Sequence, residues 1–202
     1  MSEALTPLAL SALAMLCERP MHPYEMYRLM VERYEHEVVK VRPGTLYHAM
    51  TRMADAGLVQ AVGTDREGGR PERTTYRITP SGHAAMRERI RTLLATPVNE
   101  YPRFPAALGE IHHLPRAEVL DLLAARIRAL EAKVVEAARV LDAVAERVPE
   151  IYLIDRHYLV EMANAELGWL RGVAVRIETE ELEWPHRTPR GLPRGTTEPA
   201  VL

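Results

Sequence analysis

Basic side chains and glycines gather in one short stretch of this chain, REGGRPERTTYR at residues 66–77. Four arginines occur within these twelve residues, beside a Gly-Gly pair: Arg66, Arg70, Arg73 and Arg77. Arginine binds phosphate through two parallel N–H groups and enters narrow minor grooves of DNA. Glycine lets a loop approach another backbone closely. The stretch therefore suits phosphate or nucleic-acid binding, although an isolated solvated turn has the same composition.

The stretch RPGTLYHAMTRM, residues 42–53, places a Pro-Gly pair before an amphipathic pattern. Helical spacing puts apolar side chains on one face and polar ones opposite: Leu46, Ala49, Met50 and Met53 against Thr45, His48, Thr51 and Arg52. We expect Pro43 and Gly44 to form a turn and Thr45 to open a helix. The first turn of such a helix offers N–H groups to phosphate, and its polar face suits base edges. A solvated helix in a small α/β domain would show the same pattern.

Groups that could catalyse a reaction are scarce. Serine occurs only three times, and the single cysteine, Cys17, ends an apolar helical pattern that is typical of a core residue. The eight histidines form no H-x-x-x-H pair, and adjacent His112 and His113 are expected to point to different sides of a regular element. We therefore predict no enzyme activity, no cofactor and no metal within one chain, while a metal site assembled between chains stays open.

The composition is that of a soluble globular protein: 47% of the 202 residues are hydrophobic, 27% are charged, and the formal net charge is -2. The first twenty residues lack the basic start and the cleavage site of a signal peptide, and no run is long enough to span a bilayer. A single cysteine excludes an intramolecular disulfide and fits a reducing compartment. We expect a cytoplasmic protein without a membrane partner.

The distribution of charge divides the chain in two. Residues 1–92 contain 13 Lys and Arg against 11 Asp and Glu, whereas residues 115–183 contain 9 against 14. A slightly basic N-terminal half joined to an acidic C-terminal half predicts two domains with different partners.

Proline, glycine and capping residues predict the order of elements in the N-terminal half. The expected elements are a helix from Pro7, a helix from Pro23, an extended segment at 37–41, a helix from Thr45 to Gly57, strands at 58–64 and 73–79, and a helix from Pro80. Thr6 and Thr79 suit the N-caps of the first and last of these helices. Three helices followed by a hairpin are the outline of a winged helix-turn-helix.

The C-terminal half carries a regular helical pattern after a proline-rich connector. Apolar residues then repeat every 3.5 positions, which predicts a coiled-coil seam ended by Pro149: Ile127, Leu130, Val134, Ala137, Leu141, Val144 and Val148. A second helix over 150–183 completes an antiparallel helical hairpin. We therefore expect a mainly α fold with one small β-hairpin. The predicted parts are a winged helix-turn-helix domain (1–95), a connector (96–114), a helical dimerisation and effector domain (115–183) and a disordered tail (184–202).

Three motifs in this order resemble the PadR family of bacterial transcriptional regulators: MHPYEMYRLM, RPGTLYHAMTRMADAGLV and GRPERTTYRITPSG. They fall within the first 90 residues, and AELGWLRG at 165–172 resembles the longer PadR subfamily. The resemblance implies a homodimeric repressor whose C-terminal helices form the dimer interface and which responds to small aromatic or drug-like molecules. Position 23 is proline where many relatives have glycine, a change that a helix start tolerates.

The resemblance assigns DNA contacts to the third helix, to residues beside it and to the loop between the strands. The carried-over candidates are Tyr24, Thr45, Tyr47, His48, Arg52, Gly69 and Arg70. The helix and loop patterns add Arg42, Gly44, Thr51 and Arg73. Tyr47 adjoins the apolar face, so its side chain points either to DNA or to the core. Tyr24 either packs the helix-turn-helix or donates to phosphate.

The last predicted helix carries three large side chains on one face, Tyr158, Met162 and Trp169, which suit an aromatic effector or a plain dimer core. The dimer interface is assigned to six apolar residues: Leu130, Val134, Leu141, Val144, Leu170 and Val173. We predict a ligand-responsive repressor that binds a pseudo-palindromic operator in double-stranded DNA as a homodimer. The alternative is a winged-helix and coiled-coil module for protein assembly, without sequence-specific DNA binding.

Overall fold

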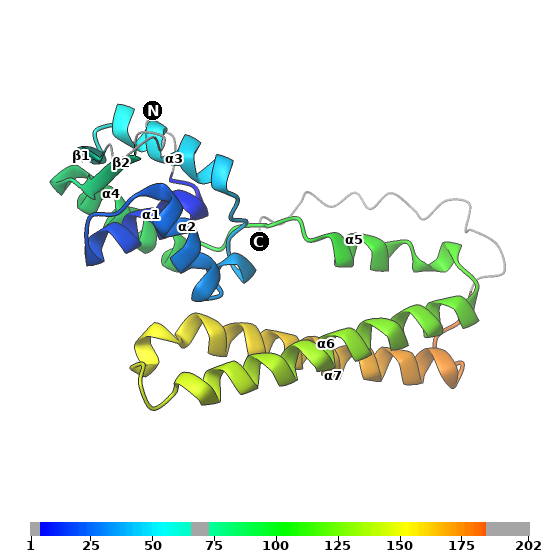
Figure 1. The fold of residues 1–202 in the computed structure, drawn as a ribbon. Helices are drawn as coiled ribbons and strands as arrows, with labels where there is room; N and C mark the ends of the chain where they lie inside the picture. The colour runs from blue at the N-terminus through cyan, green and yellow to red at the C-terminus, as the bar shows by residue number, and fades with distance from the viewer. Residues whose placement is uncertain (1–4, 66–72, 185–202) are drawn as a thin grey trace, which may run out of the picture. The chain divides into compact units, whose positions relative to one another are not determined.

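The computed structural model describes residues 5–65 and 73–184 of the chain (Figure 1). The chain divides into two compact units, Met1–Glu100 and Tyr101–Leu202. The described residues form seven α-helices, three short 3-10 helices and one antiparallel pair of strands. The predicted mainly α fold with a single β-hairpin is confirmed. No helix in the described ranges is long and apolar enough to cross a membrane.

The first unit has the element order of a winged helix-turn-helix. Its elements are α1 (Pro7–Glu18), α2 (Pro23–Glu32), η1 (Glu35–Glu37), α3 (Pro43–Asp55), β1 (Val59–Asp65), β2 (Arg73–Ile78) and α4 (Pro80–Ala95). Each of the four α-helices begins with a proline, whose missing N–H costs nothing in the first turn. Thr6 and Thr79 cap α1 and α4 as predicted: their hydroxyls accept from the N–H groups of Ala9 and Gly82 at 3.2 and 3.0 Å.

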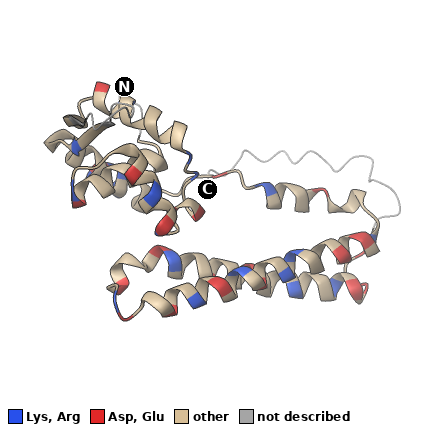
Figure 2. Ribbon diagram, in the orientation of Figure 1, with Lys and Arg blue, Asp and Glu red and all other residues tan. Residues whose placement is uncertain are grey.

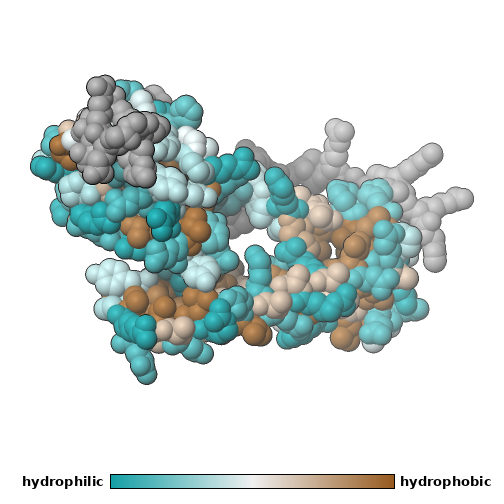
Figure 3. Space-filling view, in the orientation of Figure 1, coloured by the Kyte–Doolittle hydropathy of each residue, from teal (hydrophilic) through white to brown (hydrophobic). Residues whose placement is uncertain are grey.

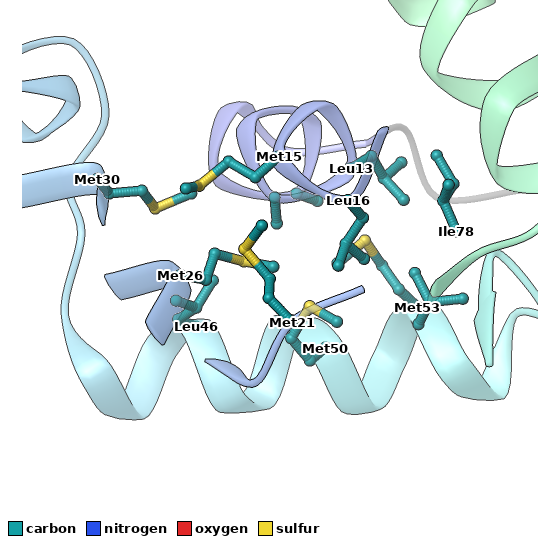
Figure 4. Packing of buried hydrophobic residues seen from close by; sticks show 13 residues of the cluster. Leu13, Met15, Leu16, Met21, Met26, Met30, Leu46, Met50, Met53 and Ile78 are labelled. Carbon is teal, nitrogen blue, oxygen red and sulfur yellow. The ribbon is translucent and has the colours of Figure 1, made fainter. Parts of the chain in front are cut away.

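Methionine dominates the core of the first unit, which joins α1, α2, α3 and the hairpin (Figure 4). Ten large side chains with at most 8% exposure meet there: Leu13, Met15, Leu16, Met21, Met26, Met30, Leu46, Met50, Met53 and Ile78. Unbranched methionine fills irregular gaps between helices that cross at several angles. This packing fixes which face of α3 points inward.

Two local predictions in the first unit are wrong. Residues 37–41 do not form an extended segment, because Tyr34 adopts a left-handed conformation (φ 59°) and the chain then turns through η1 to bury Val39. Helix α3 begins at Pro43 and not at Thr45. A proline fits the first helical position, so the Pro-Gly pair belongs to the first turn of the helix.

The β-hairpin is anchored to the helices at its base. Met21 forms an isolated bridge with Tyr76 through two backbone hydrogen bonds of 3.1 Å. The Thr79 hydroxyl contacts the carbonyl oxygens of Gly57 and Leu58 at 2.7 and 3.0 Å. Gly57 ends α3 with φ +70°, the left-handed conformation that favours glycine, as the sequence predicts. These contacts fix the base of the hairpin to the helical core.

The second unit is a helical hairpin with a short helix in front. Its elements are α5 (Arg103–Gly109), η2 (Ile111–His113), α6 (Arg116–Val144), η3 (Glu150–Tyr152) and α7 (Ile154–Glu178), and α6 and α7 run antiparallel (Figure 1). Helix α6 ends at Val144, before the predicted stop at Pro149, because a turn closes there: the N–H groups of Arg147 and Val148 both donate to the Val144 carbonyl at 2.9 Å. Helix α5 lies in the segment that the sequence predicts as a connector.

The core of the second unit lies where the start of α6 packs against the end of α7. Val119, Leu123, Leu170 and Ile177 are buried, and Phe104 of α5 packs against them. The Arg126 guanidinium stacks on the Phe104 ring, 3.5 Å from its centroid, and pairs with Glu166 of α7. Helix α5 is thus held on α6 by an aromatic contact that also engages α7.

Candidate nucleic-acid interface

Helix α3 has one face in the core and one in solvent, as its sequence pattern predicts. Leu46, Ala49, Met50 and Met53 are at most 3% exposed. The polar candidates of this segment lie on the surface: Arg42, Gly44, Thr45, His48, Thr51 and Arg52. The methionine core, to which α3 contributes Leu46, Met50 and Met53 (Figure 4), therefore holds α3 in one rotational setting about its axis.

The N-terminus of α3 differs from those of its neighbours. Side chains cap α1, α2 and α4, whereas no side chain caps α3. The Thr45 hydroxyl donates back to the Arg42 carbonyl at 2.8 Å. Open space surrounds the position of a Cβ on Gly44. The first turn of α3 therefore leaves N–H donors and the positive end of its dipole accessible to an anion.

Tyr47 lies on the surface beside α2 and not in the core. Its side chain is 43% exposed, and its ring meets the His22 ring edge-on with centroids 5.7 Å apart. The hydroxyl lies 3.5 Å from His22 Nε2, while His22 Nδ1 accepts from the Tyr24 N–H at 3.1 Å and so caps α2. Tyr24 is 50% exposed. These contacts link the start of α2 to the outer face of α3.

Strand β2 runs close to this outer face. A hollow of about 90 Å³ is lined by residues of α2, α3 and β2: His22, Pro23, Tyr47, Met50, Thr51, Thr74 and Tyr76. Tyr76 is partly buried and packs against the core of the first unit. Gly69 and Arg70 lie outside the described residues, and Arg73 begins β2.

Ion pairs occupy two carboxylates of α1 and α2. Arg33, which follows α2, contacts Glu18, the last residue of α1, at 2.5 and 2.9 Å, and Arg19 contacts Glu25 at 2.5 Å. The hydrogen bond from Arg33 lowers the pKa of Glu18, and that from Arg19 lowers the pKa of Glu25. The first pair joins the ends of α1 and α2 and so supports the helices on which α3 rests.

The dimer candidates occupy different environments within one chain. Leu170 is fully buried in the hairpin core, so its side chain has no surface for a partner in this conformation. The other five candidates are half-buried: Leu130, Val134, Leu141, Val144 and Val173. Other apolar side chains of α6, η3 and α7, which the sequence pattern did not identify, face solvent: Val135, Tyr152 and Val175 are 69%, 73% and 54% exposed. Helix α6, which carries the 3.5-residue repeat, packs against α7 of the same chain. The repeat therefore does not identify the residues that would contact a second chain.

The three effector candidates share an exposed face of α7. Tyr158, Met162 and Trp169 are 62%, 52% and 50% exposed. Figure 3 shows apolar side chains on the visible surface of the helical hairpin, and Figure 2 shows basic and acidic residues interspersed along the same helices. An aromatic ligand on this face would need a second wall from outside α7 to bury both sides of its ring.

The structure brings together two clusters of metal-ligating or nucleophilic side chains that the sequence does not predict. His112 and His113 do not point apart, because their ring centroids lie 4.2 Å from each other beside Glu110. Cys17 Sγ lies 3.7 Å from His83 Nδ1, yet burial raises the pKa of the Cys17 thiol and so disfavours the reactive thiolate. Neither cluster leaves a signal in sequence spacing alone.

Residues 12–88 match the model of the transcriptional regulator PadR-like family. The fold is similar to that of Bacillus subtilis PadR in complex with operator DNA (TM-score 0.72, 17% identity, 85% of this chain and 99% of that chain). It is also similar to the same protein in complex with p-coumaric acid (0.69, 16%, 85% and 98%). A PadR-like regulator from Bacillus cereus gives 0.60 at 14% identity, over 86% and 99% of the two chains. No curated protein sequence matches the chain. The resemblance to PadR-like regulators is confirmed, and at these identities the structural likeness shows the fold.

Proposed function

We propose that this chain, whose first unit carries the PadR-like domain, is a ligand-responsive transcriptional repressor that binds operator DNA as a homodimer. The proposal rests on three features of α3. Its apolar face is buried in the methionine core, its polar face is exposed, and no side chain caps its N-terminus. B. subtilis PadR, which has the same fold, has been crystallised in complex with operator DNA.

In the proposed complex α3 enters the major groove. His48 and Thr51 lie on its exposed face and reach base edges, where a hydroxyl or an imidazole can read the donor and acceptor pattern. The N–H groups of the first turn bind a phosphate, which Gly44 allows to approach closely. Arg42 and Arg52 contact the sugar-phosphate backbone, and Tyr24 and Tyr47 donate hydroxyl hydrogen bonds at the edge of the groove.

The loop between β1 and β2 would follow the flanking backbone or minor groove. Four arginines lie at or beside it, and arginine suits both phosphate and a narrow minor groove. Gly69, Arg70 and Arg73 are the residues to which we assign this contact. Loss of one phosphate contact there would weaken binding to all DNA sequences alike.

The helical hairpin is the proposed dimer interface. Large apolar side chains are exposed on α7 in a single chain, among them Ile154 (61%), Tyr158 and Trp169. Contiguous exposed apolar surface of this kind marks a protein interface in a globular protein. A twofold dimer would place two α3 helices in successive major grooves of a pseudo-palindromic site.

The effector site is proposed on the same face of α7, where the partner protomer supplies the second wall. Tyr158, Met162 and Trp169 offer flat and polarisable surfaces to an aromatic molecule. B. subtilis PadR has been crystallised in complex with p-coumaric acid, an aromatic acid. A ligand that favours a dimer geometry with the wrong spacing between recognition helices would release DNA by a shift in population.

A fluorescence-anisotropy titration with DNA from upstream of the chain's own gene tests the proposal. Arg42 suits the test because its side chain caps no N–H group, so Arg42→Ala leaves the helix start intact. We expect Arg42→Ala to weaken binding and to reduce the salt dependence by about one unit of log K against log [salt]. Arg147→Ala, which removes an exposed arginine of the second unit, should leave both quantities unchanged. Equal binding of specific and random duplexes by the parent protein would favour the assembly module instead.

A further inference from the structure

The junction between α5 and α6 brings three metal-ligating side chains to one place on the second unit. Glu110, His112 and His113 each offer one ligand atom, and these atoms lie within 4.8 Å of one another. We propose that they form a binding site for a divalent transition-metal ion of the zinc class. None of these three residues is among those assigned above to DNA or to the effector.

The local backbone explains why these side chains converge. In a 3-10 helix residues three apart eclipse each other, which stacks Glu110 and His113 on one edge of η2. His113 Nε2 already lies 3.3 Å from Glu110 Oε2. The His112 ring is tilted by 37° against the His113 ring, with 4.2 Å between their centroids. The tight turn thus overrides the divergence that an α-helix or a strand would impose on adjacent residues.

The backbone that carries the three side chains is held on both sides. The His113 N–H donates to the Glu110 carbonyl at 3.1 Å, and Ile111 packs against the core of the second unit. The Leu114 carbonyl accepts from Trp184 Nε1 at 3.1 Å. Glu110 and His113 are exposed and His112 is half-buried, so their side chains can rotate without disturbing the fold. A firm backbone with adjustable side chains suits ion capture.

Two imidazoles and one carboxylate are a donor set for Zn²⁺ and neighbouring transition metals, and they leave a coordination position open for water. Bond lengths of about 2.0–2.2 Å place neighbouring ligand atoms of a tetrahedral ion about 3.4 Å apart. The Glu110–His113 separation of 3.3 Å meets this requirement. The remaining pairs, within 4.8 Å, close on the ion by side-chain rotation.

A plain surface ion pair between Glu110 and protonated His113 is the competing explanation. Such an exposed pair contributes little to stability and makes no use of His112. Metal binding requires both rings in the neutral form with a lone pair on each, so it uses all three residues. The two explanations therefore differ in whether His112 matters.

Isothermal titration of the untagged full chain with zinc chloride tests the site. We expect one zinc ion per chain with a dissociation constant in the micromolar range, and no heat from magnesium chloride, since Mg²⁺ prefers oxygen ligands. Glu110→Gln, His112→Asn and His113→Asn should each weaken binding by at least about tenfold, because even residues that only support a ligand have effects of that size. Far-ultraviolet circular dichroism verifies that each variant keeps its helices.

Two control variants locate the binding. His157→Asn removes an exposed histidine of α7 and should leave the affinity unchanged. His83→Asn, beside Cys17, should also leave it unchanged. Absence of stoichiometric zinc binding would overturn the proposal. So would zinc binding that any one of Glu110→Gln, His112→Asn and His113→Asn leaves unchanged, or zinc binding that His83→Asn abolishes.

Discussion

Individual residues of this chain differ sharply in what a small substitution would do, and two glycines make the contrast clear. A Cβ on Gly44, in the first turn of α3, would meet open space, whereas a Cβ on Gly82, in the first turn of α4, would lie 2.1 Å from the Leu58 carbonyl oxygen. Gly82 is therefore needed for the packing of α4 on the hairpin. Gly44 has no such role within the chain, which fits a position that a ligand approaches.

Gly44→Ala should keep the fold and weaken DNA binding. Alanine is the better helix former by up to about 1 kcal/mol, so the midpoint of thermal unfolding should stay the same or rise. A methyl group between the helix and a phosphate should disturb one hydrogen bond and lower operator affinity by about tenfold. Calorimetry and anisotropy on the same preparation measure both effects. Unchanged affinity would remove Gly44 from the proposed interface.

Gly82→Ala should lower the stability of the fold. The added methyl group overlaps backbone and must push α4 away from the Leu58 turn, at a cost of about 1–3 kcal/mol in the free energy of unfolding. Urea denaturation of the parent and the variant measures this difference. A variant as stable as the parent would mean that α4 does not pack here as described.

The Glu18–Arg33 pair predicts how stability depends on pH. Arg33 lowers the pKa of Glu18 below its ordinary value of 4.5, so the contribution of the pair is complete above pH 4.5 and is lost as pH falls through the lower folded-state value. Both side chains are about half exposed, so the contribution should be under about 1 kcal/mol.

Urea denaturation of the parent and Glu18→Gln at several pH values measures this contribution. The parent should be the more stable protein at neutral pH, and the difference should vanish below the folded-state pKa of Glu18. Glu37→Gln, which removes an exposed carboxylate of η1, serves as the control. A difference between parent and Glu18→Gln that does not change with pH would contradict the role of the pair.

At the scale of elements, the sequence predicts what depends on neighbours along the chain. The caps Thr6 and Thr79, the stop at Gly57 and both strands follow from local residue types. Features that depend on distant residues do not. Tyr47 is placed by His22, 25 positions away. After Tyr34 the chain turns through η1 and buries Val39, although Val38 and Val39 are residue types that favour strands. The convergence of His112 and His113 depends on a 3-10 turn that no periodicity announces.

Helix α7 exposes Tyr158 and Trp169 on the face that we assign to the dimer interface. Tyr158→Glu together with Trp169→Glu places two charges on its exposed face and should convert a dimer into a monomer, while the hairpin core at Leu170 remains intact. Lys133→Glu, a charge change at an exposed position of α6, should leave the dimer unchanged. Light scattering after size-exclusion chromatography gives the masses. A dimer that persists in the double variant would exclude this face as the interface.

At the scale of the whole molecule, the chain combines a slightly basic unit of mixed α and β structure with an acidic helical unit. The distribution of charge along the sequence predicts two domains with different partners. The sequence does not predict that α5 packs on α6 through Phe104 and Arg126, because a proline-rich segment shows no periodicity. Nor does the heptad pattern distinguish pairing within one chain from pairing between chains. In the proposed mechanism, a ligand on the helical unit changes the spacing of two α3 helices. This mechanism requires helices of two different chains to pair.

Selection of binding sites from a random duplex library tests whether the outer face of α3 reads DNA sequence. The parent protein should enrich a pseudo-palindromic consensus. His48→Ala and Thr51→Ala, both exposed and outside the core, should each change the preferred bases at symmetric positions and leave the rest of the consensus intact. The same consensus from the parent and both variants, or no consensus from the parent, would contradict the account.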